Sequence, residues 1–137
     1  IGNTRSYYFD EQGRISDASI LESRHRLGNL VAGIYNTFFE QLNWLRVFNT
    51  STSHFSLAVE LFSIEGTQVG TYNLSLEPQH GIDLELSLST GISLAEDSYG
   101  LVRVRPSKAS ALLSDILRVK QQPGSYVIDM GKPMPLR

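Results

Sequence analysis

The chain contains no cysteine among its 137 residues. This absence excludes a disulfide-stapled scaffold and any zinc site built on cysteine ligands. Long hydrophobic runs are absent as well, since no apolar stretch approaches the ~18 residues of a membrane-spanning helix. We therefore expect no insertion into a membrane. No signal peptide is visible, and the start at Ile1 without a methionine predicts a trimmed or processed chain.

Charge is scarce, because charged residues make up only 19% of the chain and the net charge is −2. The densest positive segment is Arg24-His25-Arg26. Without a basic stripe the sequence lacks the electrostatic footprint of a nucleic-acid binder, so no nucleic-acid partner is expected. The hydrophobic share of 41% is ordinary and argues against disorder. Length and even composition predict a single domain over residues 1–137.

What the sequence does contain is alternation of apolar and polar residues. The clearest stretch is Ile82-Asp83-Leu84-Glu85-Leu86-Ser87-Leu88. A period of two is typical of a strand with one face on the core and the other in water. The pattern predicts that Ile82, Leu84, Leu86 and Leu88 are buried and that Asp83 and Glu85 are exposed.

A hairpin is predicted just upstream, over residues 55–76, with its turn at Gly66 and its end before Pro78. Further strands are expected at 7–9, 14–15, 20–26, 30–35, 42–48, 99–105, 111–119 and 126–128. Residues 111–119 fit a helix as well as a strand, and their strand neighbours favour the strand. The stretch 30–45 has enough bulk for one helical turn. Strands at this spacing predict an all-β, antiparallel, immunoglobulin-like β-sandwich with at most one short helix.

A resemblance to known families covers roughly residues 42–105. It rests on Leu45-Arg46-Val47-Phe48-Asn49-Thr50-Ser51, on Leu57 to Phe62, on Gly66, on Leu76-Glu77-Pro78 and on Ile82-Asp83-Leu84. This rhythm resembles the cysteine-free immunoglobulin-like and fibronectin-III-like modules of bacterial secreted and surface proteins. The resemblance implies a spacer, adhesion or carbohydrate-binding role outside the cytoplasm, at the cell surface, in the periplasm or in the extracellular medium. It supplies no catalytic residues.

Candidate metal and cofactor sites are weak. The histidines at positions 25, 54 and 80 are far apart and show no metal-ligand spacing. The acidic segments at Asp10-Glu11-Gln12-Gly13 and Glu96-Asp97 lack the calcium-loop pattern. No glycine-rich phosphate loop occurs. We expect folding without any cofactor.

Catalytic constellations are equally weak. Ser93 follows Gly91 but lacks the second glycine of a nucleophile elbow. Asp83 and Glu85 share one strand face, which in a sandwich ordinarily faces solvent. We therefore predict that the chain is not an enzyme. Asn49-Thr50-Ser51 and Asn73-Leu74-Ser75 match the N-glycosylation pattern, which matters only in a secreted eukaryotic protein.

Aromatic residues are the remaining functional signal. Tyr35, Phe38, Phe39 and Trp44 crowd into one short segment, and adjacent residues of an extended chain point in opposite directions. At least one ring of the Phe38-Phe39 pair is then expected to face outward, so we predict that these four residues contact a partner. The expected function is a non-catalytic module for adhesion, protein–protein contact or structural spacing. The alternative is a carbohydrate-binding module with exposed aromatics. A homo-oligomer is left open.

Overall fold

The computed structural model describes residues 3–9, 11–22, 31–108, 112–122, 125–131 and 134–135, and side chains over 11–14, 31–108 and 112–120. These residues form strands and one short 3₁₀ turn, η1 (Phe38–Glu40), with no α-helix in the described part. The strands are β1 (Asn3–Phe9), β2 (Ile15–Glu22), β3 (Val31–Asn36), β4 (Leu42–Asn49), β5 (Phe55–Ser63), β6 (Gln68–Leu76), β7 (Gly81–Glu85), β8 (Tyr99–Pro106), β9 (Leu112–Gln122), β10 (Ser125–Gly131) and β11 (Met134–Pro135).

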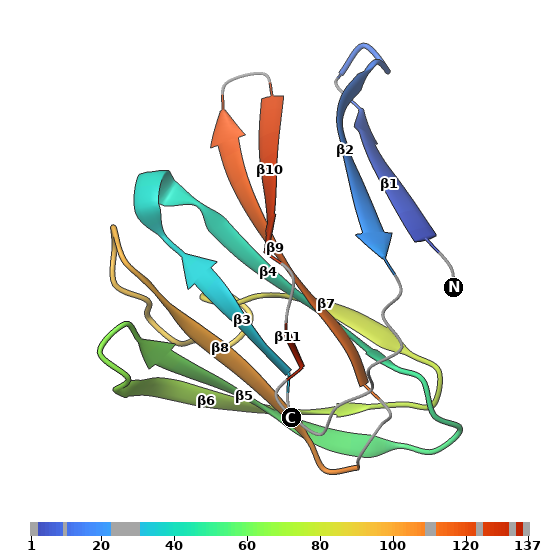
Figure 1. Cartoon of the computed structure of the whole chain (residues 1–137), viewed down its shortest axis with the longest axis vertical. Helices are drawn as coiled ribbons and strands as arrows, with labels where there is room; N and C mark the ends of the chain where they lie inside the picture. Colours follow the sequence, from blue (N-terminus) through green and yellow to red (C-terminus); the bar gives the residue numbers. More distant parts are fainter. Residues whose placement is uncertain are drawn as a thin grey trace.

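The strands form two main antiparallel sheets and one hairpin (Figure 1). One sheet has the order β10-β9-β4-β7, and the other has the order β11-β3-β8-β5-β6. β1 pairs only with β2, and β2 lies against β10. The expected all-β antiparallel sandwich is thus confirmed.

The core lies between the two main sheets, and strand alternation explains its composition. In β5, every second residue from Phe55 to Leu61 is buried. In the neighbouring strand β8, Val102 and Val104 alternate with more exposed residues in the same way and are also buried. The buried apolar cluster comprises Val31, Tyr35, Leu45, Val47, Phe55, Leu57, Val59, Leu61, Leu76, Leu84, Leu86, Val102, Val104, Leu112 and Ile116. Full burial of one such side chain stabilises the fold by about 1.5–3 kcal/mol.

The prediction for residues 82–88 is wrong in part. Leu84 and Leu86 are buried, as expected, but Ile82 is 39% and Leu88 82% exposed, and Glu85 is only 4% exposed. β7 is an edge strand, so Ile82 lies at the open rim of the core. β7 also ends at Glu85, whose carboxylate accepts hydrogen bonds from the residues that follow it. The alternation therefore stops where the chain turns out of the sheet.

Several other predictions can be compared with the structure. Of the ambiguous segment 111–119, residues 112–119 are strand, in β9, and residue 111 lies outside the described part; the helical turn expected within 30–45 is η1. Residues 14–15 and 20–26 were predicted as separate strands, whereas Ile15–Glu22 is one strand, β2, and residues 23–26 lie outside the described part. Gly66 has φ +83°, as its predicted turn requires. Pro78 follows the end of β6.

Candidate functional site

Tyr35 does not belong to a surface, which corrects its predicted role as a contact residue. Its exposure is 2%, because the alternation of β3 turns it into the core. There it lies across Gly100, its partner on β8. Burial raises the pKa of the Tyr35 hydroxyl, and the nearby charge of Glu65 raises it further. The residue is a core element that fills the space above a glycine.

Phe38 and Phe39 differ in exposure, but their rings lie close together, with 6.5 Å between the centroids. The segment is a 3₁₀ turn and not the extended chain on which the prediction of opposite directions rests. Phe38 is half-buried and packs against Tyr99, with 6.2 Å between the ring centroids. Phe39 has φ 58°, which turns its ring outward to an exposure of 70%. The Lys120 ammonium lies 4.7 Å from the centroid of the Phe39 ring. η1 therefore presents one aromatic ring to solvent and anchors it beside another.

Exposed apolar side chains also lie on the outer face of the five-stranded sheet. The register places Ile34, Leu101 and Phe62 side by side on β3, β8 and β5. Ile34 is 55% and Leu101 37% exposed. Together with Ile64 and Tyr99, these three residues line a shallow depression of about 350 Å³. We call the set Ile34, Phe38, Phe39, Phe62, Ile64, Tyr99 and Leu101 the outer patch.

Sequence reasoning did not find the sheet portion of the outer patch. A signal was present, since Leu101 is apolar although its neighbour Val102 is a core residue. A strand that is apolar on both faces is typical of a sheet covered on both sides. On this outer face Ile34, Tyr99 and Leu101 are nevertheless exposed.

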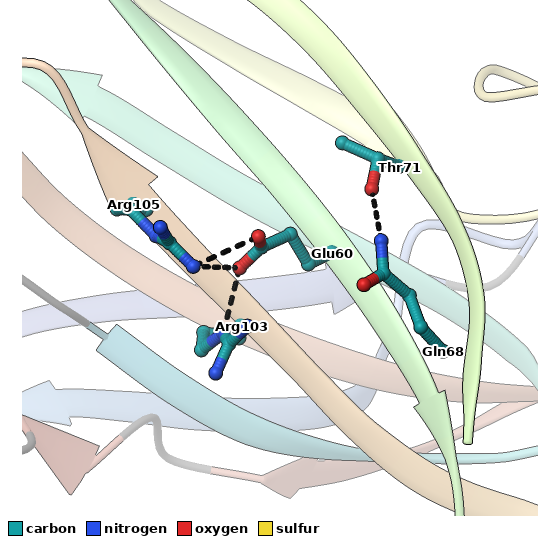
Figure 2. A network of polar contacts seen from close by, with 5 residues as sticks. All are labelled: Glu60, Gln68, Thr71, Arg103 and Arg105. Atoms are coloured by element: carbon teal, nitrogen blue, oxygen red, sulfur yellow. Dashed lines mark hydrogen bonds and ion pairs between the residues drawn. The ribbon is translucent and has the colours of Figure 1, made fainter. Parts of the chain in front are cut away.

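A charged cluster borders the outer patch (Figure 2). The carboxylate of Glu60 accepts a 2.6 Å hydrogen bond from Nε of Arg103 and 2.9 and 3.0 Å bonds from Arg105. The Arg103 guanidinium also lies 4.5 Å from the centroid of the Phe62 ring. On the neighbouring strand, Gln68 donates to the Thr71 hydroxyl. Arg103 thus fixes the Phe62 side chain while it neutralises Glu60.

The charge state of Glu60 follows from these contacts. Partial burial by itself raises the pKa of the Glu60 carboxyl, but the hydrogen bonds and charges of Arg103 and Arg105 outweigh it, and the net pKa lies below its usual value. A lowered pKa means that the ion pairs stabilise the fold above the ordinary glutamate pKa. This stabilisation is lost as the pH falls through the folded-state value.

Glu60→Gln should therefore lower the free energy of unfolding by about 1–2 kcal/mol at pH 7, since an amide cannot replace two charge-assisted contacts. Urea denaturation of both proteins between pH 7 and about pH 3 measures the difference. The difference should shrink as the pH falls below the ordinary glutamate pKa, because the wild type loses the ion-pair stabilisation as Glu60 binds a proton. A difference that stays constant across this range would show that the ion pairs contribute nothing.

Trp44 lies on the other side of the sandwich, apart from the outer patch. It is 37% exposed on the outer face of the four-stranded sheet. A second depression, of about 180 Å³, is lined by Trp44, Arg46, Asp83, Leu117 and Val119. Arg46 and Asp83 form a two-pronged ion pair, with N···O distances of 2.9 and 3.1 Å. The four predicted contact residues therefore occupy three places, and only Phe38 and Phe39 stay together.

The weaker candidates are dispersed. Asp83 is exposed beside Arg46, whereas Glu85 is buried, so the two carboxylates do not face one cleft. His54 and His80 are exposed, while Asp10 and His25 lie outside the described residues. Within the described ranges, no three histidine, cysteine or acidic side chains gather at metal-binding distance. The same part of the chain holds no helix of the length and hydropathy that crossing a bilayer requires.

Comparison with known proteins places the chain only by its fold. No family model matches it, and no curated protein matches it. A solved structure described as Thermotoga maritima 1070 is similar, with a TM-score of 0.63 and 9% sequence identity over 80% of this chain and 95% of that one. At this identity the likeness concerns the fold alone.

Proposed function

We propose that this chain is a non-catalytic β-sandwich module that works through protein–protein contact outside the cytoplasm. The observation that carries the proposal is the outer patch. Apolar side chains from β3, β5, β8 and the β5–β6 turn line one shallow depression there, and Phe38 of η1 packs against Tyr99, one of the lining residues. Contiguous exposed apolar surface of this kind is typical of interaction sites. The extracytoplasmic location rests on the resemblance of residues 42–105 to surface modules.

The composition of the outer patch favours a protein as the occupant. Aromatic side chains and arginine are enriched at the centres of protein interfaces. Phe39 and Tyr99 supply rigid rings, and Arg103 lies over Phe62 while it forms an ion pair with Glu60, a carboxylate that it shares with Arg105. A partner with an apolar centre would bury the rings while Arg103 keeps this ion pair.

Leu101→Asp should abolish partner binding while leaving the melting temperature within a few degrees of the wild type, because Leu101 is 37% exposed. Affinity purification from the cells that make the protein, with quantitative comparison of the recovered proteins, measures the binding. Phe48→Asp is the matched control, since Phe48 is 40% exposed on the opposite sheet.

A partner lost with Leu101→Asp and retained with Phe48→Asp supports the proposal. Phe38→Ser and Phe39→Ser test separately whether the half-buried ring and the exposed ring of the outer patch contribute to binding. Phe39→Ser should weaken binding at an unchanged melting temperature. Recovery of the same proteins with Leu101→Asp as with the wild type would contradict the proposed surface.

The Trp44 depression supports a second candidate function, carbohydrate binding. A tryptophan ring offers a stacking platform, and the adjacent Arg46 and Asp83 offer donors and acceptors for sugar hydroxyls. Affinity electrophoresis in gels that contain soluble polysaccharides tests it. Retardation that is lost with Trp44→Ala and kept with Leu101→Asp would favour this function over the first.

A further inference from the structure

β6 forms an edge of the five-stranded sheet and lacks the features that usually prevent such an edge from pairing with another strand. It is the last strand of the five-stranded sheet, nine residues long, and its sequence Gln-Val-Gly-Thr-Tyr-Asn-Leu-Ser-Leu contains no charge and no proline. Proteins usually protect such edges with charges, proline, bulges or short strands. The other edges of the two main sheets follow this rule: β7 has five residues and carries Asp83, β10 carries Asp129, and β11 has two residues and a proline. The bulge in the β5–β6 pairing lies at Gln68, at the start of the strand.

The backbone groups on this edge can be identified from the pairing pattern. Ser107 donates its N–H to the carbonyl of Ser56, so the even-numbered residues of β5 bond toward β8. Ser63 donates to Thr67, so the odd-numbered residues of β5 bond toward β6. The β5–β6 register then uses the even-numbered residues of β6, such as Tyr72 opposite Val59.

It follows that Thr71, Asn73 and Ser75 direct their N–H and C=O groups away from the sheet. All three residues are exposed. The described residues supply no strand beyond this edge. Unused donors and acceptors along an extended strand form a template for another strand.

We propose that a second copy of this chain occupies this edge, with the two β6 strands antiparallel about a twofold axis at Asn73. In this register Asn73 faces Asn73 of the second copy, and Thr71 faces Ser75. Tyr72 then lies opposite Leu74 of the second copy, which would cover two side chains that are only half-buried in the single chain. Hydroxyl pairs and aromatic–aliphatic pairs across strands are both favourable.

The absence of charged residues from β6 favours a second copy of this chain over other occupants of the edge. A strand that pairs with itself about a twofold axis places each charge near its own image, which is costly. β6 carries none. A shift of the axis to Ser75 would bring Glu77 opposite Asn73 and would add Pro78, which has no N–H. The Asn73 register therefore uses the longest uninterrupted part of the strand. It leaves both outer patches on the same side of one continuous sheet.

Sedimentation of the full chain over a range of concentrations tests the proposal. The wild type and the control Asn73→Ser should form a dimer. Asn73→Lys and Asn73→Glu each place like charges opposite one another and should weaken self-association at least about tenfold. Mixing the two charged variants should restore a heterodimer, because lysine then faces glutamate. Both variants should stay folded by circular dichroism, since Asn73 is exposed.

Amide hydrogen exchange provides a measurement that needs no variant. In the wild type, the amides of Thr71, Asn73 and Ser75 should exchange more slowly as the protein concentration rises, while exposed amides elsewhere should not change. A wild type that stays monomeric at every concentration overturns the proposal, as does a dimer that survives both charged variants. Binding of an extended peptide to the monomer along β6 would assign the edge to another protein.

Discussion

Gly100→Ala should lower the free energy of unfolding by about 3–5 kcal/mol, a large loss for a single methyl group. An added Cβ at Gly100 would overlap the carbonyl oxygen of Phe62 and would lie 2.6 Å from the Tyr35 hydroxyl. The Phe62 oxygen is backbone, so the clash with it can be relieved only by separating β5 from β8, and the clash with the Tyr35 hydroxyl requires displacing the Tyr35 ring. Either movement disturbs the core and the outer patch together.

Gly33→Ala is the matched control for Gly100→Ala. Gly33 lies on β3, where an added Cβ would meet a side-chain methyl of Ile116 at 3.1 Å, and no backbone atom lies within 4 Å among its nearest contacts. The expected loss is about 1 kcal/mol. Chemical denaturation of both variants measures the difference. Equal losses at the two positions would contradict the claim that the close β5–β8 approach requires a glycine.

Asn49→Asp should lower the free energy of unfolding by about 3–5 kcal/mol although it changes the side chain by one atom. Asn49 has no exposed surface, and its amide donates to the carbonyls of Ser53, Leu76 and Glu77 at 2.9, 3.2 and 2.9 Å. Its own oxygen accepts from Ser51. A carboxylate would face three carbonyl oxygens with no proton to offer them.

Gln79→Glu provides the control for the added charge, because Gln79 is exposed in the β6–β7 turn and should lose well under 1 kcal/mol. Thermal and urea denaturation at pH 7 compare the two. A small effect at Asn49 would mean that the hydrogen bonds from its amide to the carbonyls of Ser53, Leu76 and Glu77 contribute little to stability. The same burial makes the Asn49 amide inaccessible in the folded chain, whereas Asn73, in the second glycosylation pattern, is exposed.

The elements that sequence reasoning predicted are those set by local pattern. The hairpin over residues 55–76, the turn at Gly66 and the stop before Pro78 are properties of neighbouring residues, and the structure confirms each of them. The error at Glu85 and Leu88 arises because β7 ends at Glu85, whose carboxylate accepts hydrogen bonds from Ser87 and Leu88. Alternation shows which residues share a face, but it does not show where a strand leaves its sheet.

The outer patch could not be predicted in full for a related reason. Phe38 and Phe39 are adjacent in the chain, so their proximity is local, and one of the two rings, that of Phe39, is exposed as expected, although the segment is a 3₁₀ turn and not extended chain. Ile34, Leu101 and Phe62 are far apart in sequence and meet only through the register of three strands. That register depends on pairing between distant segments. Tyr35 was misplaced because bulk alone does not reveal which face of β3 a residue occupies.

Site-specific photo-crosslinking tests the proposed contact surface most directly. A benzophenone amino acid replaces Ile34 or Tyr99 in the full chain, or Phe48 on the opposite sheet, and the protein is irradiated in the cells that make it. Both outer-patch positions should yield the same covalent protein adduct, Leu101→Asp should abolish it, and position 48 should yield none. No protein adduct from positions 34 and 99, or an equal adduct from position 48, would contradict the assignment of the outer patch as the contact surface.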